Sequence, residues 1–213
     1  MIGMAALIVA AMVVGALHTI APDHWLPFAA LARSRGWSAR RAARTTVLCG
    51  FGHVTVSAAL AVAALFVGLT VVHSLGARIE SKSIYLLIAF GAAYMIWGFL
   101  RDPLAVTHPH RHPHGHHDHD HGLTEWSLFL LFSADPCVAV IPMVMVAASS
   151  GWRAVALVII AYEIATLSTM VALVTTAHAG ARALRAPWLD RYGDAAAGAL
   201  IVTMGTVMAV FGW

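Results

Sequence analysis

The stretch His18-Thr19-Ile20-Ala21-Pro22-Asp23-His24 places two histidines, an aspartate and a proline inside a segment that is otherwise apolar from Ile2 to Ala32. Such a segment is long enough to cross a bilayer, which takes about 20 apolar residues. An ionisable side chain at bilayer depth costs about 2.5–3.5 kcal/mol on insertion scales, and such residues usually face a protein-lined pathway. The stretch therefore indicates a cation pathway at a break in a membrane-spanning helix.

The composition is that of a membrane protein. Apolar residues make up 60% of the chain, charged residues 11%, and the mean hydropathy is +0.79. Apolar runs predict about six transmembrane helices, at about residues 4–32, 46–72, 84–100, 125–148, 154–178 and 195–213. The first run lacks the positive start and the cleavage site of a secretory signal, so we expect it in the mature protein. We predict an all-α integral membrane protein with one domain, residues 1–213.

The basic residues predict the orientation of these spans, because short cytoplasmic loops retain Lys and Arg. Of the 13 Lys and Arg residues, ten fall in the first, third and fifth predicted loops: Arg33, Arg35, Arg40, Arg41, Arg44, Arg101, Arg111, Arg182, Arg185 and Arg191. Both termini are therefore predicted to lie outside a bacterial-type cytoplasmic (inner) membrane. Anionic headgroups account for these charges, and no nucleic-acid motif accompanies them.

A short internal repeat divides the chain into two halves. Pro27 is followed nine residues later by Gly36-Trp37, and Pro142 nine residues later by Gly151-Trp152, at an offset of 115 residues. Three spans per half give the halves opposite orientations. Inverted repeats with broken helices at the midplane are a common transporter plan. We therefore predict two inverted three-helix repeats whose first helices are broken by proline.

Prolines free backbone groups inside these broken spans, because a helical proline has no N–H for the carbonyl four residues earlier. Four carbonyls therefore lack their helical donor: those of His18, Asp23, Phe132 and Val138, which lie four residues before Pro22, Pro27, Pro136 and Pro142. In a regular helix, His18, Asp23 and His24 would point too far apart to share one small ion. A break at Pro22 would let them converge. The alternative is a kinked helix whose polar side chains bond each other or a neighbouring span.

The chain resembles the nickel/cobalt transporter superfamily, whose signature is a histidine followed, after four residues, by Asp-His. Here the signature consists of His18 and Asp23-His24. The six-span length, the start of the second half at Asp135-Pro136-Cys137 and a histidine-rich middle loop resemble its efflux-type, NicO-like members. The resemblance implies that His18, Asp23 and His24 bind the transported metal, Ni²⁺ or Co²⁺, without a prosthetic group. Imidazole independently suits nickel, cobalt, zinc and copper, whereas a set without paired thiolates does not favour copper(I).

Four further residues are candidate auxiliary ligands. His53 lies one turn before Ser57 in the second span, and Glu163 lies in the fifth, where a buried carboxylate is costly. Asp135 and Cys137 lie at the break of the fourth span. The alternatives are interhelical hydrogen bonding for His53 and Glu163 and burial as a small apolar side chain for Cys137.

The third loop, residues 102–124, is predicted to be cytoplasmic and rich in metal-binding side chains. It contains His108, His110, His112, His114, His116, His117, His119 and His121. The prolines and charges among them disfavour helix and strand, and such a segment collects cations through many weak sites. Such a collector favours export, but it also fits an importer that buffers incoming metal. The alternative is a tolerated low-complexity insertion.

The sequence therefore favours secondary transport of a divalent transition metal, nickel or cobalt first, with export preferred over an uptake permease or permease subunit. No catalytic motif is present, so we do not expect an enzyme. The alternative of another class is a membrane thiol-disulfide electron carrier using Cys49 and Cys137. A metal sensor or storage protein would bind metal without moving it. The last-span glycines Gly198, Gly205 and Gly212 predict close helix packing or a contact with a second copy.

Overall fold

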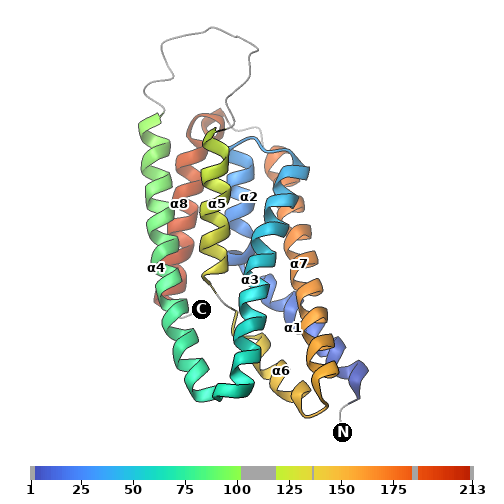
Figure 1. Ribbon diagram of the computed structural model, residues 1–213. Helices are drawn as coiled ribbons and strands as arrows, with labels where there is room; N and C mark the ends of the chain where they lie inside the picture. The colour runs from blue at the N-terminus through green and yellow to red at the C-terminus, as the bar shows by residue number, and fades with distance from the viewer. Residues whose placement is uncertain (1–2, 102–118, 136, 184–186, 212–213) are drawn as a thin grey trace.

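The computed structural model describes residues 3–101, 119–135, 137–183 and 187–211, and all regular structure in these ranges is helical. The predicted all-α class is therefore confirmed for this part of the chain. The helices are α1 (Met4–Thr19), α2 (Pro22–Ser34), α3 (Ala39–Val67), α4 (Leu69–Arg101), α5 (His119–Ser133), α6 (Val140–Ala148), α7 (Trp152–Ala183) and α8 (Pro187–Phe211). Figure 1 shows them as one elongated bundle.

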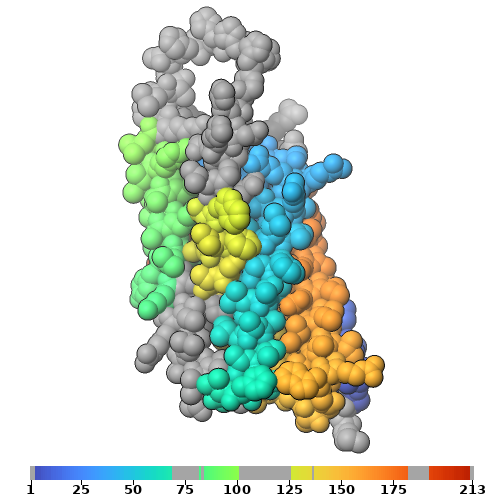
Figure 2. Space-filling model, viewed as in Figure 1, coloured from blue at the N-terminus to red at the C-terminus, as the bar shows by residue number. Residues whose placement is uncertain are grey.

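Three of the described helices are long and apolar enough to cross a membrane, within Ala39–Val67, Trp152–Ala181 and Tyr192–Phe211, and the pair α1 and α2 makes a fourth if it is one bent span. Large apolar side chains on these and neighbouring helices are exposed, among them Phe51, Leu130 and Ile164. Figure 2 shows the face of the bundle that α3, α4, α5 and α7 form. Exposed apolar surface of this kind suits lipid rather than water. The six predicted spans stay a prediction.

The predicted break at Pro22 is confirmed. α1 ends at Thr19, α2 begins at Pro22, and the two helices are bent by 52°. Proline fits the first position of a helix, where its missing N–H has no helical partner in any case. The carbonyl of His18 accepts instead from the N–H of Ala21, at 3.2 Å. The break leaves His18 and His24 on two differently directed helices.

The second half of the chain contains another broken pair of helices. α5 ends at Ser133 and α6 begins at Val140, with Asp135-Pro136-Cys137 between them. In Figure 1, α1 and α6 occupy one end of the bundle, whereas α2 and α5 occupy the other. The chain therefore passes through the two breaks in opposite directions.

A glycine turn follows each broken pair. Gly36, between α2 and α3, has φ +61°, and Gly151, between α6 and α7, has φ +92°. Glycine adopts this left-handed conformation without the steric cost of a side chain. The two glycines paired by the sequence repeat thus stand at corresponding points of the fold. Trp37 is buried and Trp152 is exposed, so the repeat extends to the backbone but not to the packing of these rings.

Most of the buried apolar residues in the described ranges belong to two clusters, and the long helices α3 and α7 pass through both. The first cluster, around α1 and α6, includes Leu7, Ala61, Ala64, Val144 and Val158. The second cluster, around α2 and α5, includes Phe28, Leu31, Ala42, Leu128 and Val174. Along α3 and α7, the buried polar residues His53, Ser57 and Thr166 lie between the stretches that enter the two clusters. A buried polar layer therefore separates two apolar ones.

Helices α4 and α8 approach closely because glycines line their contact. A Cβ atom on Gly98 of α4 would lie 2.5 Å from the backbone nitrogen of Ala195, and one on Gly205 of α8 would lie 2.7 Å from Cγ1 of Ile88. Gly198 likewise faces the backbone of Met95. The predicted close packing of the last-span glycines is thus confirmed within the chain for Gly198 and Gly205, and Gly212 lies outside the described residues.

We expect Gly98→Leu to lower the stability of the protein, because the new side chain would meet backbone atoms of α8 that cannot rotate away. Overpacking of this kind costs about 1–3 kcal/mol. Thermal melting in detergent, followed by circular dichroism, measures the change. Gly180→Leu on α7 is the matched control, since a Cβ atom there meets nothing within 4 Å. Equal melting temperatures for the two variants would contradict the close contact.

Candidate metal site

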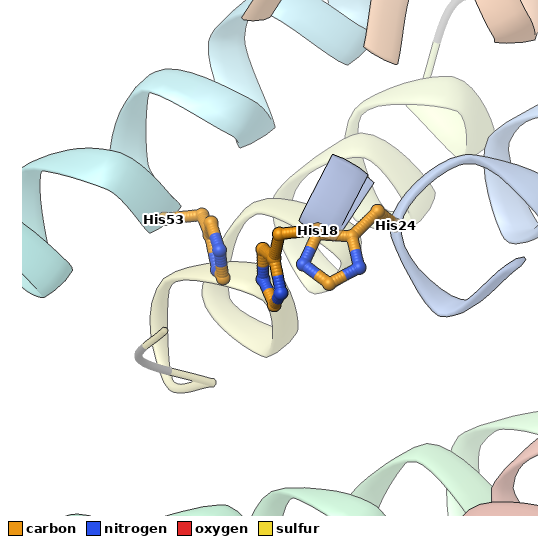
Figure 3. Close-up of side chains that lie close together, drawn as sticks. All are labelled: His18, His24 and His53. Carbon is orange, nitrogen blue, oxygen red and sulfur yellow. The ribbon is translucent and has the colours of Figure 1, made fainter. Parts of the chain in front are cut away.

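Three histidines form the histidine cluster, whose members are His18, His24 and His53. One ring nitrogen from each lies within 4.8 Å of the other two. Figure 3 shows the three rings close together, reached from three different helices. The ring centroids of His18 and His24 are 4.3 Å apart, and those of His24 and His53 are 5.3 Å apart. The break between α1 and α2 thus brings its two histidines together, and α3 supplies the third.

The cluster has nearly the dimensions of a metal site. An ion placed equally between three atoms 4.8 Å apart would lie about 2.8 Å from each, whereas metal–imidazole bonds measure about 2.0–2.1 Å for zinc. Side-chain movements of under about 1 Å would close the site. His24 and His53 are buried, so an ion bound here would be largely withdrawn from solvent.

A hydrogen bond fixes which nitrogen of His53 can bind a metal. Nδ1 lies 3.3 Å from the carbonyl oxygen of Phe132. A carbonyl only accepts, so Nδ1 carries the proton and Nε2 keeps its lone pair. Nε2 is buried and has no hydrogen-bond partner among the described residues. A metal-binding histidine commonly donates its other N–H to a carbonyl in this manner.

The carbonyl that holds His53 comes from the second helix break. Residue 136 is proline, so no N–H is available there to continue the helical bond to Phe132. The Phe132 carbonyl accepts a long bond from the N–H of Asp135, at 3.4 Å, beside that from His53. The second break therefore supports a ligand candidate that lies next to the first break.

Asp23 lies beside the histidine cluster. Its Oδ1 is 2.9 Å from Nδ1 of His24. Asp23 is not, however, a member of the group whose ligand atoms all lie within 4.8 Å of one another. The sequence predicted His18, Asp23 and His24 as the site. In the structure, His53 takes the third place in the cluster, and the Asp23 carboxylate contacts the ring of His24.

A cavity of about 430 Å³ lies at the cluster, and both helix breaks line it. The first break contributes Ala21, Pro22 and Asp23, the second contributes Asp135 and Cys137, and α8 contributes Met204, Val207 and Met208. Asp23, Asp135 and Met208 also line a second, much smaller cavity. Protein interiors are otherwise close-packed, and a space of this size holds an ion with several water molecules.

The auxiliary candidates fall in different places. Asp135 and Cys137 line the cavity, but the Cys137 sulfur lies outside the histidine cluster, 2.9 Å from the hydroxyl of Tyr162. Glu163 is partly exposed on α7 and is not among the described residues that line the cavity. Of the four auxiliary candidates, His53 thus belongs to the cluster, Asp135 and Cys137 line the cavity, and Glu163 lies apart.

The predicted loop, residues 102–124, falls mostly outside the described residues. This holds for His108, His110, His112, His114, His116 and His117. His119 and His121 belong to α5, which begins at His119 and therefore includes the last residues of the predicted loop. These residues follow the prolines at 109 and 113, so proline does not interrupt the helix there.

Met204 and Met208 are among the cavity residues that the sequence did not single out. Met204 and Met208 are four residues apart, which places them on one face of α8. That spacing is visible in the sequence, but it is also the spacing of any apolar face of a helix. Only the packing of α8 against the two breaks distinguishes them.

The described residues thus form a helical bundle with three or four helices that could cross a membrane, and a mostly buried histidine cluster lies at its two helix breaks. Comparisons with protein-family models, curated proteins and solved structures find no match to the chain. The geometry of the site and the chemistry of its residues are therefore the guide to its function.

We expect His53→Ala to weaken metal binding although His53 lies outside the sequence signature. The test uses a loop-silenced chain, in which serine replaces the eight loop histidines listed above. Isothermal titration with Ni²⁺ or Co²⁺ should give one tight site, and the variant should bind at least about tenfold more weakly, by comparison with the 10–100-fold effect of outer-sphere changes. His178→Ala, which removes a buried histidine outside the cluster, is the control. Equal losses in both variants would exclude a specific role for His53.

Proposed function

We propose that the protein is a secondary carrier of a divalent transition-metal ion across the cytoplasmic membrane, with nickel and cobalt as the leading substrates. The observation that carries this proposal is the meeting of two broken helices at a buried histidine cluster with a cavity beside it. A site of this kind combines ligands for the ion with backbone that is not committed to a regular helix. Membrane carriers commonly bind their ions at broken helices.

The proposal includes six spans in two inverted halves. Each half would consist of a broken pair of helices followed by two long ones: α1–α2, α3 and α4, then α5–α6, α7 and α8. The opposite directions of the two breaks support this organisation, as do the matching positions of Gly36 and Gly151. Inverted halves can exchange roles, so that the site between them opens to one side of the membrane and then to the other.

The ligands favour a borderline transition metal. Three neutral imidazoles suit Ni²⁺, Co²⁺ and Zn²⁺, whereas Mg²⁺ and Ca²⁺ prefer a shell of oxygen atoms. Three sulfur-containing residues, Cys137, Met204 and Met208, line the cavity and agree with the softer choice. The His-x4-Asp-His signature supports membership of the nickel/cobalt transporter superfamily and places nickel and cobalt before zinc.

The thiol-disulfide alternative receives less support. Cys49 and Cys137 form no disulfide and belong to different apolar clusters, the second and the first respectively. A relay requires the two thiols to meet, and the packing of two separate clusters opposes that. It also leaves the histidine cluster without a role.

Direction follows from the predicted orientation. With both termini outside, the histidine-rich loop faces the cytoplasm and would concentrate metal at the inner mouth, which favours export over uptake by a permease. No ATP-binding motif is present in the sequence. Energy would therefore come from an ion gradient or from a partner chain.

We expect purified protein in vesicles to carry radioactive nickel or cobalt, and His24→Ala to abolish the flux because it removes a ligand at the first break. The loop-silenced chain should retain a weaker flux, since the loop collects the ion but does not form its path. The direction with the faster flux would identify an exporter or an importer. The double variant with serine at positions 49 and 137 should keep its flux. Undiminished flux in His24→Ala would refute the central site, and flux lost with the two cysteines would favour the relay.

A further inference from the structure

Ser57 joins α3 to the second helix break. It lies one turn after His53 and is 1% exposed. Its hydroxyl donates to the carbonyl of His53 at 2.8 Å and accepts from the backbone N–H of Cys137, also at 2.8 Å. A hydroxyl has one hydrogen to donate. Ser57 donates it within α3, and its oxygen accepts the hydrogen bond that links α3 to the second break.

α3 therefore holds the second break at two points, one on each side of Pro136 in the sequence. Before the proline, the Phe132 carbonyl accepts from Nδ1 of His53. After it, the Cys137 N–H donates to Ser57. Because His53 and Ser57 are four residues apart on one helix, they lie on the same face and bind the chain on both sides of Pro136.

Loss of the Ser57 hydroxyl would remove the hydrogen bond from the Cys137 N–H. A buried backbone N–H without a partner is unfavourable, so the segment around Cys137 would shift to find another acceptor or water. The Phe132 carbonyl lies five residues earlier, in the last turn of α5 directly before the interruption, and a shift of the interruption would change the distance of this carbonyl from His53. The ring of His53 would then lose the bond that sets its tautomer.

We propose that Ser57 is a positioning residue of the histidine cluster. It holds the second break against α3, so that the Phe132 carbonyl keeps Nδ1 of His53 protonated and Nε2 available to the metal. This inference deepens the proposed function and rests on it for the identity of the ligand, a divalent transition-metal ion. It also makes the affinity of the site depend on the position of the second break, which belongs to the half of the chain that supplies none of the three histidines.

The first test needs no metal. In protein labelled with ¹⁵N at histidine, the nitrogen shifts of His53 should report a single tautomer with the proton on Nδ1, and Ser57→Ala should give a mixture. Thr46→Val is the matched control, because Thr46 is also buried on α3 but its hydroxyl donates to the carbonyl of Ala42 in its own helix. An unchanged His53 tautomer in Ser57→Ala would overturn the proposal.

The second test measures Co²⁺ binding to the loop-silenced chain by calorimetry and by visible absorption. Ser57→Ala should weaken binding by about 10–100-fold, as changes to residues behind metal ligands do, and should alter the cobalt spectrum. Ser57→Thr, which keeps a hydroxyl, should restore both, and Thr46→Val should change neither.

A double-mutant cycle separates positioning from general damage to the fold. In the His53→Ala background, Ser57→Ala should cause no further loss of affinity, since Ser57 acts through His53. An equal loss in both backgrounds would overturn the proposal. Absence of Co²⁺ binding in the parent chain would instead refute the proposed function, while the tautomer measurement would still decide the role of Ser57.

Discussion

A helix that is interrupted inside an apolar bundle leaves backbone groups that must find partners, because lipid and apolar side chains offer none. The protein meets this constraint at two places. At the first break, the N–H of Ala21 closes onto the carbonyl of His18. At the second, side chains of α3 bind the Phe132 carbonyl and the Cys137 N–H. At the first break a backbone N–H pairs with a backbone carbonyl. At the second break the side chain of His53, a candidate metal ligand, pairs with a backbone carbonyl.

The surroundings of the site follow from these breaks. Polar groups gather where the breaks lie, and the apolar residues separate into one cluster at each end of the bundle. α3 and α7 run through both clusters and hold the ends together. The cavity lies where both breaks and α8 meet, so the space available to an ion is surrounded by backbone that can move without unwinding a complete helix.

Much of this arrangement could be predicted from local sequence. The break at Pro22 and the carbonyl freed at Phe132 follow from the missing N–H of proline, and the repeat pairs the two glycines that the structure places at corresponding turns. Membership of the histidine cluster could not be predicted in the same way. Asp23 is adjacent to His24 in sequence, but adjacent residues on a helix point in different directions. His53 joins the cluster through the packing of α3 against two other segments, which no spacing within one helix reveals. Glu163 illustrates the converse, since burial cost singled it out and its position on α7 leaves it partly exposed.

X-ray absorption spectroscopy at the metal edge, on the loop-silenced chain loaded with one equivalent of Ni²⁺, tests the central claim most directly. The account predicts outer-shell scattering from three imidazole rings, reduced to two in His53→Ala. A nickel environment of oxygen atoms without imidazole scattering, or one unchanged by His53→Ala, would contradict the claim that the two helix breaks assemble a histidine site for the metal.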